Sequence, residues 1–280
     1  MTGVTAGTRL LALLGDPVHH SLSPVIQNAA FQAAAVDGVY VSLRCSADDL
    51  PVFLRALGRA GGGGNVTLPH KERAAAVVDE PTDAVRRTGA CNTFWWQDGK
   101  VWGDNTDVEG LRQAIRVFRD RTSEGSRVLL LGAGGAARAA LVALLDDDAS
   151  EVVLLNRSIE RARIVSRRIG GSRVRVAENR DEIAGEKFSL VVNATRLGLS
   201  ENDPLPFDLG TLGEVGGVMD LVYSQGETPF VRHAHSLGYP AVDGREMLVR
   251  QGAASFERWW GIPAPLEVMQ EALGTLESVG

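Results

Sequence analysis

Short apolar runs alternate with amphipathic stretches along the first third of the chain. Residues 9–15 (RLLALLG) and 39–45 (VYVSLRC) are apolar runs of strand length. Ser23 followed by Pro24 is typical of a helix N-cap and first helical position, and residues 46–60 repeat apolar side chains at helical spacing. Strands that alternate with helices predict a mainly parallel sheet.

Two further stretches of this region depart from simple alternation. Residues 91–107 (CNTFWWQDGKVWGDNTD) contain two short strand patterns about an Asp-Gly pair, which predicts a β-hairpin. Four consecutive glycines, residues 61–64, lead into NVTLP, a predicted third strand with a corner. We expect glycine here to let backbone pack closely where the end of the sheet forms a pocket floor, with two of the four being neutral.

The second half begins with a different pattern. The apolar run 128–131 leads directly into a glycine-rich turn and an alanine-rich helix. Further strands are predicted within 151–158, 188–195 and 216–223, with a helix over 159–170. This order is typical of a doubly wound, Rossmann-type sheet.

These patterns predict an α/β protein of two domains. The first is an α/β substrate domain with a mainly parallel sheet, formed by residues 1–107 and 247–280. The second is a C-terminal Rossmann-type doubly wound domain, residues 108–246. The helical tail carries Trp259 and Trp260, which we expect to pack within the chain rather than form a dimer patch.

Composition excludes several classes of protein. The 280 residues carry a formal charge of −6 and are 44% hydrophobic, so no overall basic field attracts nucleic acid or anionic lipid. Cys45 and Cys91 are the two cysteines, which we expect to be buried and reduced. Without a basic leader or a run of about 20 apolar residues, the sequence indicates a soluble cytoplasmic protein.

The glycine-rich turn predicts a dinucleotide site. Gly132, Gly134 and Gly135 follow an apolar strand and precede a helix, and Ala137 takes the place of the third glycine of the usual pattern. Such glycines let backbone approach a pyrophosphate at the positive end of the helix. The alternative is a turn that is merely tight.

The end of the next strand indicates which dinucleotide binds. An acid there would hold the ribose 2′-hydroxyl of NAD, but this chain has Asn156, Arg157 and Ser158, followed by Arg161 and Arg163. Guanidinium groups bind a 2′-phosphate through charge-assisted hydrogen bonds, so we predict NADP.

Polar residues gather at the predicted strand ends and loops of the first domain. They are Ser21, Ser23, Asn65, Thr67, Lys71, Asn92 and Asn105 to Asp107. Each alone is explained equally well as a cap, a turn residue or a solvated side chain. Together they suit a polyhydroxylated small molecule, with a lysine and an aspartate for proton transfer.

Eight short motifs resemble the shikimate dehydrogenase family, in the same order and across nearly the whole chain. They are HSLSP (20–24), NVTLPHK (65–71), CNT (91–93), GDNTD (103–107), GAGGAAR (132–138), NRS (156–158), NAT (193–195) and MLVRQGA (247–253). The resemblance implies a two-domain α/β enzyme that reduces 3-dehydroshikimate to shikimate with NADPH, in the chorismate pathway of aromatic amino-acid biosynthesis.

The resemblance also implies roles for individual residues. By this resemblance Lys71 and Asp107 would form the catalytic pair. A lysine is ordinarily protonated near neutral pH, which suits proton donation. In the oxidation direction the proton would leave through a deprotonated Lys71 or through water, and both routes stay open. The substrate would be held by Ser21, Ser23, Asn65, Thr67, Asn92, Tyr223 and Gln251. NADP would be held by Gly132, Gly134, Gly135, Ala136, Asn156, Arg157, Ser158, Arg161, Thr195, Leu221, Gly244 and Met247.

Two positions depart from the family pattern. Arg196 follows NAT where a small residue is usual, and Glu246 stands where a second glycine is usual. These two side chains either pair on the surface, or they mark a branch that prefers quinate or an amino-substituted analogue, whose ammonium an added acid would favour.

Other classes of function remain open. A non-catalytic sensor of shikimate-type ligands would be expected to have lost Lys71 or Asp107, and neither is lost. A dehydrogenase of another small molecule, such as a folate derivative, explains the HSLSP and NVTLPHK hydroxyls less well. We expect no metal, since the five histidines lack acid or thiol neighbours at ligand spacing, and we expect a monomer or homodimer.

Overall fold

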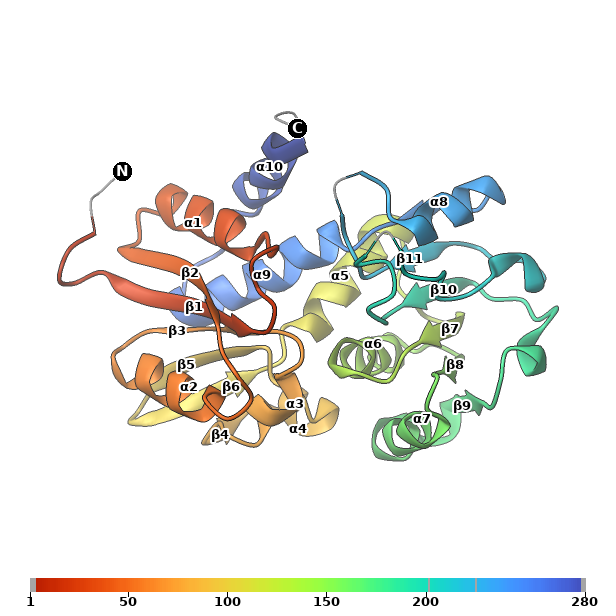
Figure 1. Ribbon diagram of the computed structural model, residues 1–280, viewed down its shortest axis with the longest axis horizontal. Coiled ribbons are helices and arrows are strands. Elements are labelled where there is room, and N and C mark those ends of the chain that lie inside the picture. The colour runs from red at the N-terminus through yellow and green to blue at the C-terminus, as the bar shows by residue number, and fades with distance from the viewer. Residues whose placement is uncertain (1–3, 201, 225, 278–280) are drawn as a thin grey trace. The chain divides into compact units, whose positions relative to one another are not determined.

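The chain forms two compact units in a computed structural model that describes residues 4–200, 202–224 and 226–277 (Figure 1). Unit 1 comprises Met1–Gly110 and Leu248–Gly280, and unit 2 comprises Leu111–Met247. Two helices, α5 (Asp107–Arg119) and α9 (Arg245–Trp260), contain the points where the units divide. None of the helices in the described ranges is long and apolar enough to cross a membrane.

Unit 1 is built on a six-stranded sheet of order β2-β1-β3-β5-β6-β4. Its strands are β1 (Arg9–Gly15), β2 (Gly38–Arg44), β3 (Gly63–Val66), β4 (Glu80–Pro81), β5 (Thr93–Gln97) and β6 (Lys100–Asp104). Three of the five pairings between these strands are parallel, and β3–β5 and β5–β6 are antiparallel. Strands β5 and β6 form the predicted hairpin, which turns at Asp98 and Gly99 with φ of 51° and 77°.

Both faces of this sheet are covered, which explains the unbroken apolar run of β1. Leu11 and Leu13 face a core with side chains of α1 (Ser23–Ala33), α9 and α10 (Leu266–Glu277). Ala12 and Leu14 face a second core with α2 (Leu50–Arg59). The short helices α3 (Lys71–Ala75) and α4 (Asp83–Thr88) complete the unit.

Two predictions about the helices of unit 1 have clear outcomes. Leu22, rather than Ser23, is the N-cap of α1, and no side chain caps this helix, so the predicted Ser23 cap is wrong. Trp259 and Trp260 both pack against Phe31 within the chain, as expected.

The glycine run before β3 is required by the packing of the sheet. A Cβ on Gly62 would lie 2.1 Å from the Leu10 carbonyl oxygen, and one on Gly63 would lie 2.6 Å from that of Phe94. Gly64 has φ of +155° and leaves only 1.9 Å to the oxygen of Ala12. Gly61 adopts φ of +80°, a left-handed conformation. The prediction that two of these glycines are neutral is therefore wrong.

Unit 2 contains a six-stranded sheet of order β12-β11-β10-β7-β8-β9, in which every pairing is parallel. Its strands are β7 (Arg127–Leu131), β8 (Glu151–Leu155), β9 (Val174–Ala177), β10 (Leu190–Asn193), β11 (Val218–Asp220) and β12 (Ala241–Val242). Counted from β7, the order is the doubly wound 3-2-1-4-5-6 arrangement, so the Rossmann-type prediction is confirmed.

Helices α6 (Gly135–Asp146), α7 (Ile159–Val165) and α8 (Pro229–Ser236) belong to this unit. After α7 the chain continues as a π-helical turn, Ser166–Gly170, within the predicted helix 159–170. The sequence patterns did not predict β9, β12 or α8. The two strands are too short, at four and two residues, to show a period.

Candidate active site

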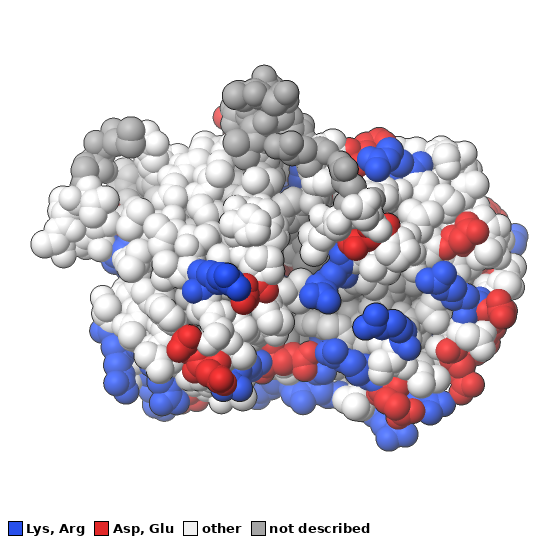
Figure 2. All heavy atoms as spheres, in the orientation of Figure 1, with Lys and Arg blue, Asp and Glu red and all other residues white. Residues whose placement is uncertain are grey.

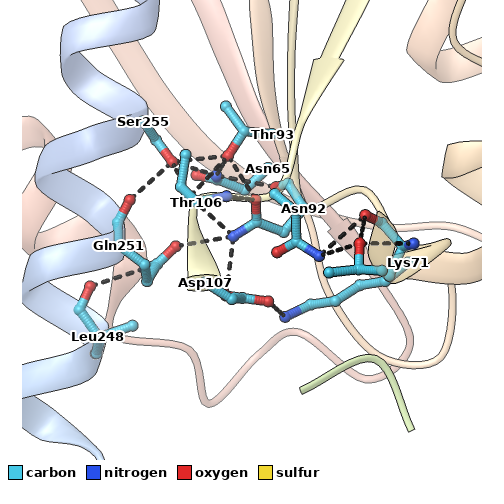
Figure 3. A network of polar contacts seen from close by, with 12 residues as sticks. Asn65, Lys71, Asn92, Thr93, Thr106, Asp107, Leu248, Gln251 and Ser255 are labelled. Atoms are coloured by element: carbon cyan, nitrogen blue, oxygen red, sulfur yellow. Dashed lines mark hydrogen bonds and ion pairs between the residues drawn. The ribbon is translucent and has the colours of Figure 1, made fainter. Parts of the chain in front are cut away.

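Lys71 and Asp107 form a close ion pair in unit 1 (Figure 3). Lys71 opens α3 and Asp107 opens α5, and the lysine Nζ lies 2.6 Å from Asp107 Oδ2. Only 14% of the lysine side chain and 5% of the aspartate side chain are exposed. The geometry brings together a cation and an acid from positions 36 residues apart.

The corner before Lys71 is anchored on both sides. The buried His70 side chain meets the Cys45 carbonyl oxygen through Nε2 at 2.8 Å, and the Cys91 amide donates to the Lys71 carbonyl at 2.8 Å. Both cysteines are free and buried, as expected, and burial raises the pKa of Cys91 to about 12. The corner is therefore held at His70 by the residue after β2 and at Lys71 by the segment before β5.

Asn92 orients the aspartate from its other side. The Thr106 backbone amide donates to Asn92 Oδ1 at 2.8 Å, which settles which end of the amide is the oxygen. Asn92 Nδ2 consequently faces Asp107 Oδ1 and donates to it at 2.9 Å. Asp107 thus accepts one hydrogen bond from an ammonium and one from an amide, an arrangement that suits an ionised carboxylate.

A layer of buried hydroxyl groups supports these amides (Figure 3). Ser255 of α9 is fully buried and lies within 3.0 Å of Asn65 Nδ2, Thr93 Oγ1 and Thr106 Oγ1. The Tyr40 hydroxyl donates to Asn65 Oδ1 at 2.8 Å. The predicted polar positions included Asn65 and, within Asn105 to Asp107, Thr106. They missed Tyr40, Thr93 and Ser255, of which Thr93 stands within the CNT motif. Tyr40 and Ser255 carry no local signal, because only the fold brings them to this point.

Gln251 reaches the same network from α9. Its Oε1 lies 3.4 Å from Asn92 Nδ2, and its Nε2 donates to the Leu248 carbonyl at 2.8 Å. A Cβ on Gly110 would come within 2.7 Å of the Gln251 Cβ, so α5 and α9 approach each other closely here. This close approach sets the position of Gln251 relative to Asn92.

The remaining predicted substrate residues stand apart from this network. Ser21 Oγ donates to Ser23 Oγ at 3.2 Å, and the Ser23 amide donates to Ser21 Oγ. Thr67 lies half-buried at the corner after β3, and its hydroxyl has no hydrogen-bond partner among the described residues. Tyr223 belongs to unit 2, where it follows β11 and is half-buried.

The predicted dinucleotide turn of unit 2 is open at one glycine and crowded at another. Gly132 has φ of +113°, and a Cβ there would lie 2.9 Å from the Ala194 carbonyl oxygen. Gly134 is the N-cap of α6, and no atom lies within 4 Å of the place its Cβ would take. Gly135 and Ala136 follow in the first turn of the 12-residue helix, whose first amides have no partner within the helix. This open, donor-rich turn fits a pyrophosphate.

The tip of β8 offers one uncommitted cation. Ser158 caps α7 by accepting from the Arg161 amide at 3.4 Å, and the Asn156 side chain donates to the Ser158 carbonyl. Arg157 is exposed and has no ion-pair or hydrogen-bond partner among the described residues. Arg163 instead pairs with Glu160 and Glu178, so the structure does not support it as a ligand for a 2′-phosphate.

Three more predicted cofactor residues follow β10, β11 and β12, and a fourth, Met247, lies in α9. Thr195 is held by Asn193 Oδ1, which accepts from its amide at 3.0 Å and from its hydroxyl at 2.7 Å. The Leu221 amide donates to the Asn193 carbonyl, and Gly244 packs so closely that a Cβ would lie 2.4 Å from the Leu221 oxygen. Met247 is buried in the first turns of α9.

The two residues that depart from the family pattern do not interact as a pair. Arg196 is exposed and has no ion-pair partner among the described residues, so the predicted surface pair with Glu246 is wrong. Glu246 is half-buried in the first turn of α9.

On the face drawn in Figure 2, basic and acidic side chains are interspersed. Within the described ranges, no three His, Cys, Asp or Glu side chains gather as a metal site would require.

Comparison with known proteins gives a consistent result. Family models match residues 13–94 (shikimate dehydrogenase substrate binding domain), 113–196 (shikimate / quinate 5-dehydrogenase) and 244–273 (shikimate 5′-dehydrogenase C-terminal domain). The shikimate dehydrogenase (NADP(+)) of Synechocystis is 36% identical, over 98% of this chain and 97% of its own length.

Solved structures agree over the same length. The shikimate dehydrogenase of Aquifex aeolicus has a TM-score of 0.88 at 31% identity, covering 97% of this chain and 99% of that one. The shikimate 5-dehydrogenase of Thermus thermophilus, solved in complex with NADP(H) and shikimate, has a TM-score of 0.85 at 35% identity. That match covers 95% of this chain and 98% of the Thermus chain.

Proposed function

Because this chain belongs to the shikimate dehydrogenase family, we propose that it reduces 3-dehydroshikimate to shikimate with NADPH and catalyses the reverse oxidation with NADP. This step lies in aromatic amino-acid biosynthesis. The observation that carries the proposal is the buried Lys71–Asp107 pair, whose Nζ and Oδ2 are 2.6 Å apart and whose carboxylate is also held by Asn92.

The charges of this pair explain the proton transfer. NADPH, when bound, supplies a hydride to the ring ketone of the substrate. As negative charge develops on the ketone oxygen, the Lys71 ammonium stabilises it and donates the proton. Asp107 keeps the ammonium in place, and Asn92 keeps Asp107 in place. In the oxidation direction Lys71 receives the proton back, or the proton leaves through water.

We assign substrate binding mainly to polar residues of unit 1. Ser21 and Ser23 would hold the carboxylate, since within the described part of the chain their hydroxyl groups form hydrogen bonds only with each other and with one backbone amide. Thr67 has an uncommitted hydroxyl, and Asn92 and Gln251 border Asp107. Asn65 has its amide donors committed to protein groups, and can still accept through Oδ1. Tyr223 would contribute from unit 2.

We assign NADP binding to unit 2. The turn Gly132–Gly135 with Ala136 would hold the pyrophosphate. Arg157 would hold the 2′-phosphate, with Asn156, Ser158 and Arg161 beside it. Thr195, Leu221, Gly244 and Met247 would line the nicotinamide side. On this basis residues 1–107 with 247–280 form the substrate-binding and catalytic domain, and residues 108–246 form the NADP domain. We further expect a cytoplasmic monomer or homodimer.

Initial rates of cofactor reduction test the proposal. The purified protein is assayed with shikimate and with quinate, each against NADP and NAD. Fast turnover of shikimate with NADP is expected. A preference for quinate would instead place the chain in the quinate branch and make Arg196 and Glu246 the first positions to revert. Binding of shikimate and NADP without turnover of either substrate would contradict catalysis and favour a sensor.

A further inference from the structure

Asp220 is a buried acid for which the proposed reaction has no use. It is the last residue of β11 and is 0% exposed. Its carboxylate accepts hydrogen bonds from Thr228 Oγ1 at 2.7 Å, Asn193 Nδ2 at 2.8 Å and the Val222 amide at 3.1 Å. All three donors are neutral. A buried carboxylate without a cation is costly, and burial raises its pKa to about 6.

The contact between Asp220 and Asn193 determines how the Asn193 amide is oriented. An ionised carboxylate only accepts hydrogen bonds, so the Asn193 NH2 group must face Asp220 and its oxygen must face away. That oxygen accepts from the amide and the hydroxyl of Thr195 at 3.0 and 2.7 Å. The Thr195 hydroxyl in turn accepts from the Leu197 amide at 3.1 Å. The second hydrogen of the Asn193 NH2 group goes to the Leu197 carbonyl at 3.2 Å. Asp220 therefore ties the loop after β10, through Asn193, to the end of β11.

The contact between Asp220 and the Val222 amide holds the loop after β11. The Val222 amide lies between Leu221 and Tyr223, and it is held by the same Asp220 oxygen that receives Asn193. The Leu221 amide is bonded to the Asn193 carbonyl, and its own carbonyl packs against Gly244. One carboxylate thus joins the loop after β10, the loop after β11 and the approach to α9.

The contact between Asp220 and Thr228 involves a helix cap and neither of these loops. Thr228 is the N-cap of α8, and its hydroxyl accepts from the Val231 amide at 3.2 Å while it donates to Asp220. This contact stabilises the start of α8 and touches neither Asn193 nor Val222. It supplies an internal control, because its removal loosens the same corner and leaves the two loop contacts in place.

We propose that Asp220 is a positioning residue for NADP, which acts by holding Asn193 and Val222 so that Thr195 and Leu221 meet the cofactor. The inference rests on the proposed NADP-binding role of unit 2. The proposed role of the Asp220 carboxylate is to fix the conformation of two loops, and not only to stabilise the domain.

The test is NADP binding by isothermal titration calorimetry at pH 7.5 to the full-length wild type and three variants. Asp220→Ala should weaken NADP binding about tenfold or more, because it leaves the Val222 amide unpaired and leaves the Asn193 side chain held only by the loop that it positions, at Leu197 and Thr195. Asp220→Asn keeps an oxygen for these two donors and should stay within about threefold of the wild type. Thr228→Val should lower the melting temperature and also stay within about threefold.

Steady-state kinetics provide a second readout. In Asp220→Ala the KM for NADP should rise by a larger factor than the KM for shikimate, because the loop after β11 reaches the proposed substrate site only through Tyr223. General destabilisation would not produce this difference. If this variant fails to fold, Asn193→Ala removes the same link to Thr195 and should also weaken NADP binding about tenfold.

Three results would overturn the inference: wild-type affinity in a folded Asp220→Ala or Asn193→Ala protein, an Asp220→Asn variant as weak as Asp220→Ala, or a Thr228→Val variant that loses affinity equally. Failure of the wild type to bind NADP would refute the proposed function, and the inference with it. NADP binding by the wild type with no effect of these variants would refute the inference alone.

Discussion

Two glycine-rich stretches in this protein serve opposite needs. In residues 61–64 of unit 1, Gly62, Gly63 and Gly64 lie so close to neighbouring backbone that a Cβ would come within 2.6 Å of a carbonyl oxygen. At the turn after β7 in unit 2, Gly134 has nothing within 4 Å of its Cβ position. The missing side chains of Gly62, Gly63 and Gly64 let the strands of the sheet pack, whereas Gly134 leaves open space, which the proposed function assigns to the cofactor.

The side chains to which we assign function in the two units also differ. Lys71 is nearly buried and is bonded to Asp107, so its partner belongs to the protein. Arg157 is exposed and has no partner in the part of the chain that the structure describes. A reacting group needs a geometry that is set before the substrate arrives, whereas a phosphate-binding group needs only to be within reach.

Substitution of Gly64 should have the largest effect. Gly64→Ala puts a methyl group 1.9 Å from the Ala12 oxygen at a φ of +155°, so unit 1 should be destabilised by more than about 4 kcal/mol. Thermal unfolding followed by circular dichroism measures this. Gly7→Ala, where the nearest atoms are 3.7 Å away, is the matched control. A Gly64→Ala protein as stable as Gly7→Ala would remove the contrast between the two stretches.

Lys71→Ala should lower kcat about 10²-fold or more, because the developing charge on the substrate oxygen loses its cation and proton donor. The KM for NADP should change little, since this lysine belongs to unit 1. Lys187→Ala is the control, because Lys187 and its partner Glu214 are both exposed. Equal kcat in the Lys71 and Lys187 variants would remove Lys71 from the mechanism.

Arg157→Gln should weaken NADP binding about tenfold to thirtyfold and leave NAD binding unchanged, because only NADP carries the 2′-phosphate. Arg163→Gln, whose wild-type side chain is committed to Glu160 and Glu178, should alter neither. Binding measured by calorimetry for both dinucleotides checks this. A parallel loss of NAD affinity would mean that Arg157 does not recognise the phosphate.

Gly134→Ala should leave the melting temperature within about 2 °C of the wild type, since its Cβ meets open space. NADP binding should weaken about tenfold, because the methyl group enters the place of the pyrophosphate. Circular dichroism and calorimetry on the same sample separate the two effects. Unchanged affinity would show that the open space is not the cofactor site.

The smallest expected effect is a change of stability with pH that depends on the buried acid Asp220. Asp107 has an ammonium partner, whereas Asp220 has neutral donors, and burial raises its pKa to about 6 from 3.8. An acid with a raised folded-state pKa binds its proton more tightly when folded, so stability falls as pH rises through 4 to 6. Between pH 7.5 and pH 5 the wild type should gain about 1 kcal/mol relative to Asp220→Asn. Urea unfolding at the two pH values measures this, and parallel changes in both proteins would contradict it.

Local patterns in the sequence determined much of this molecule. The apolar run of β1, the Asp-Gly hairpin and the strand–glycine–helix order after residue 127 each depend on neighbours in the chain, so period and turn chemistry are enough to predict them. The same patterns pointed to two domains and, through the motifs, to Lys71, Asp107 and the glycine turn as candidates.

Contacts between distant segments decided the rest. Tyr40 and Ser255 meet at Asn65, and Asn193 meets Asp220 across 27 residues, yet none of these pairs leaves a mark on its local sequence. Likewise the sequence shows where glycines stand, but only the packed sheet distinguishes those that have no room for a Cβ, such as Gly64, from those that face open space, such as Gly134. The physical reason is that hydrogen-bond direction and steric room depend on atoms brought close by the fold, whereas period and turn preference depend on adjacent residues.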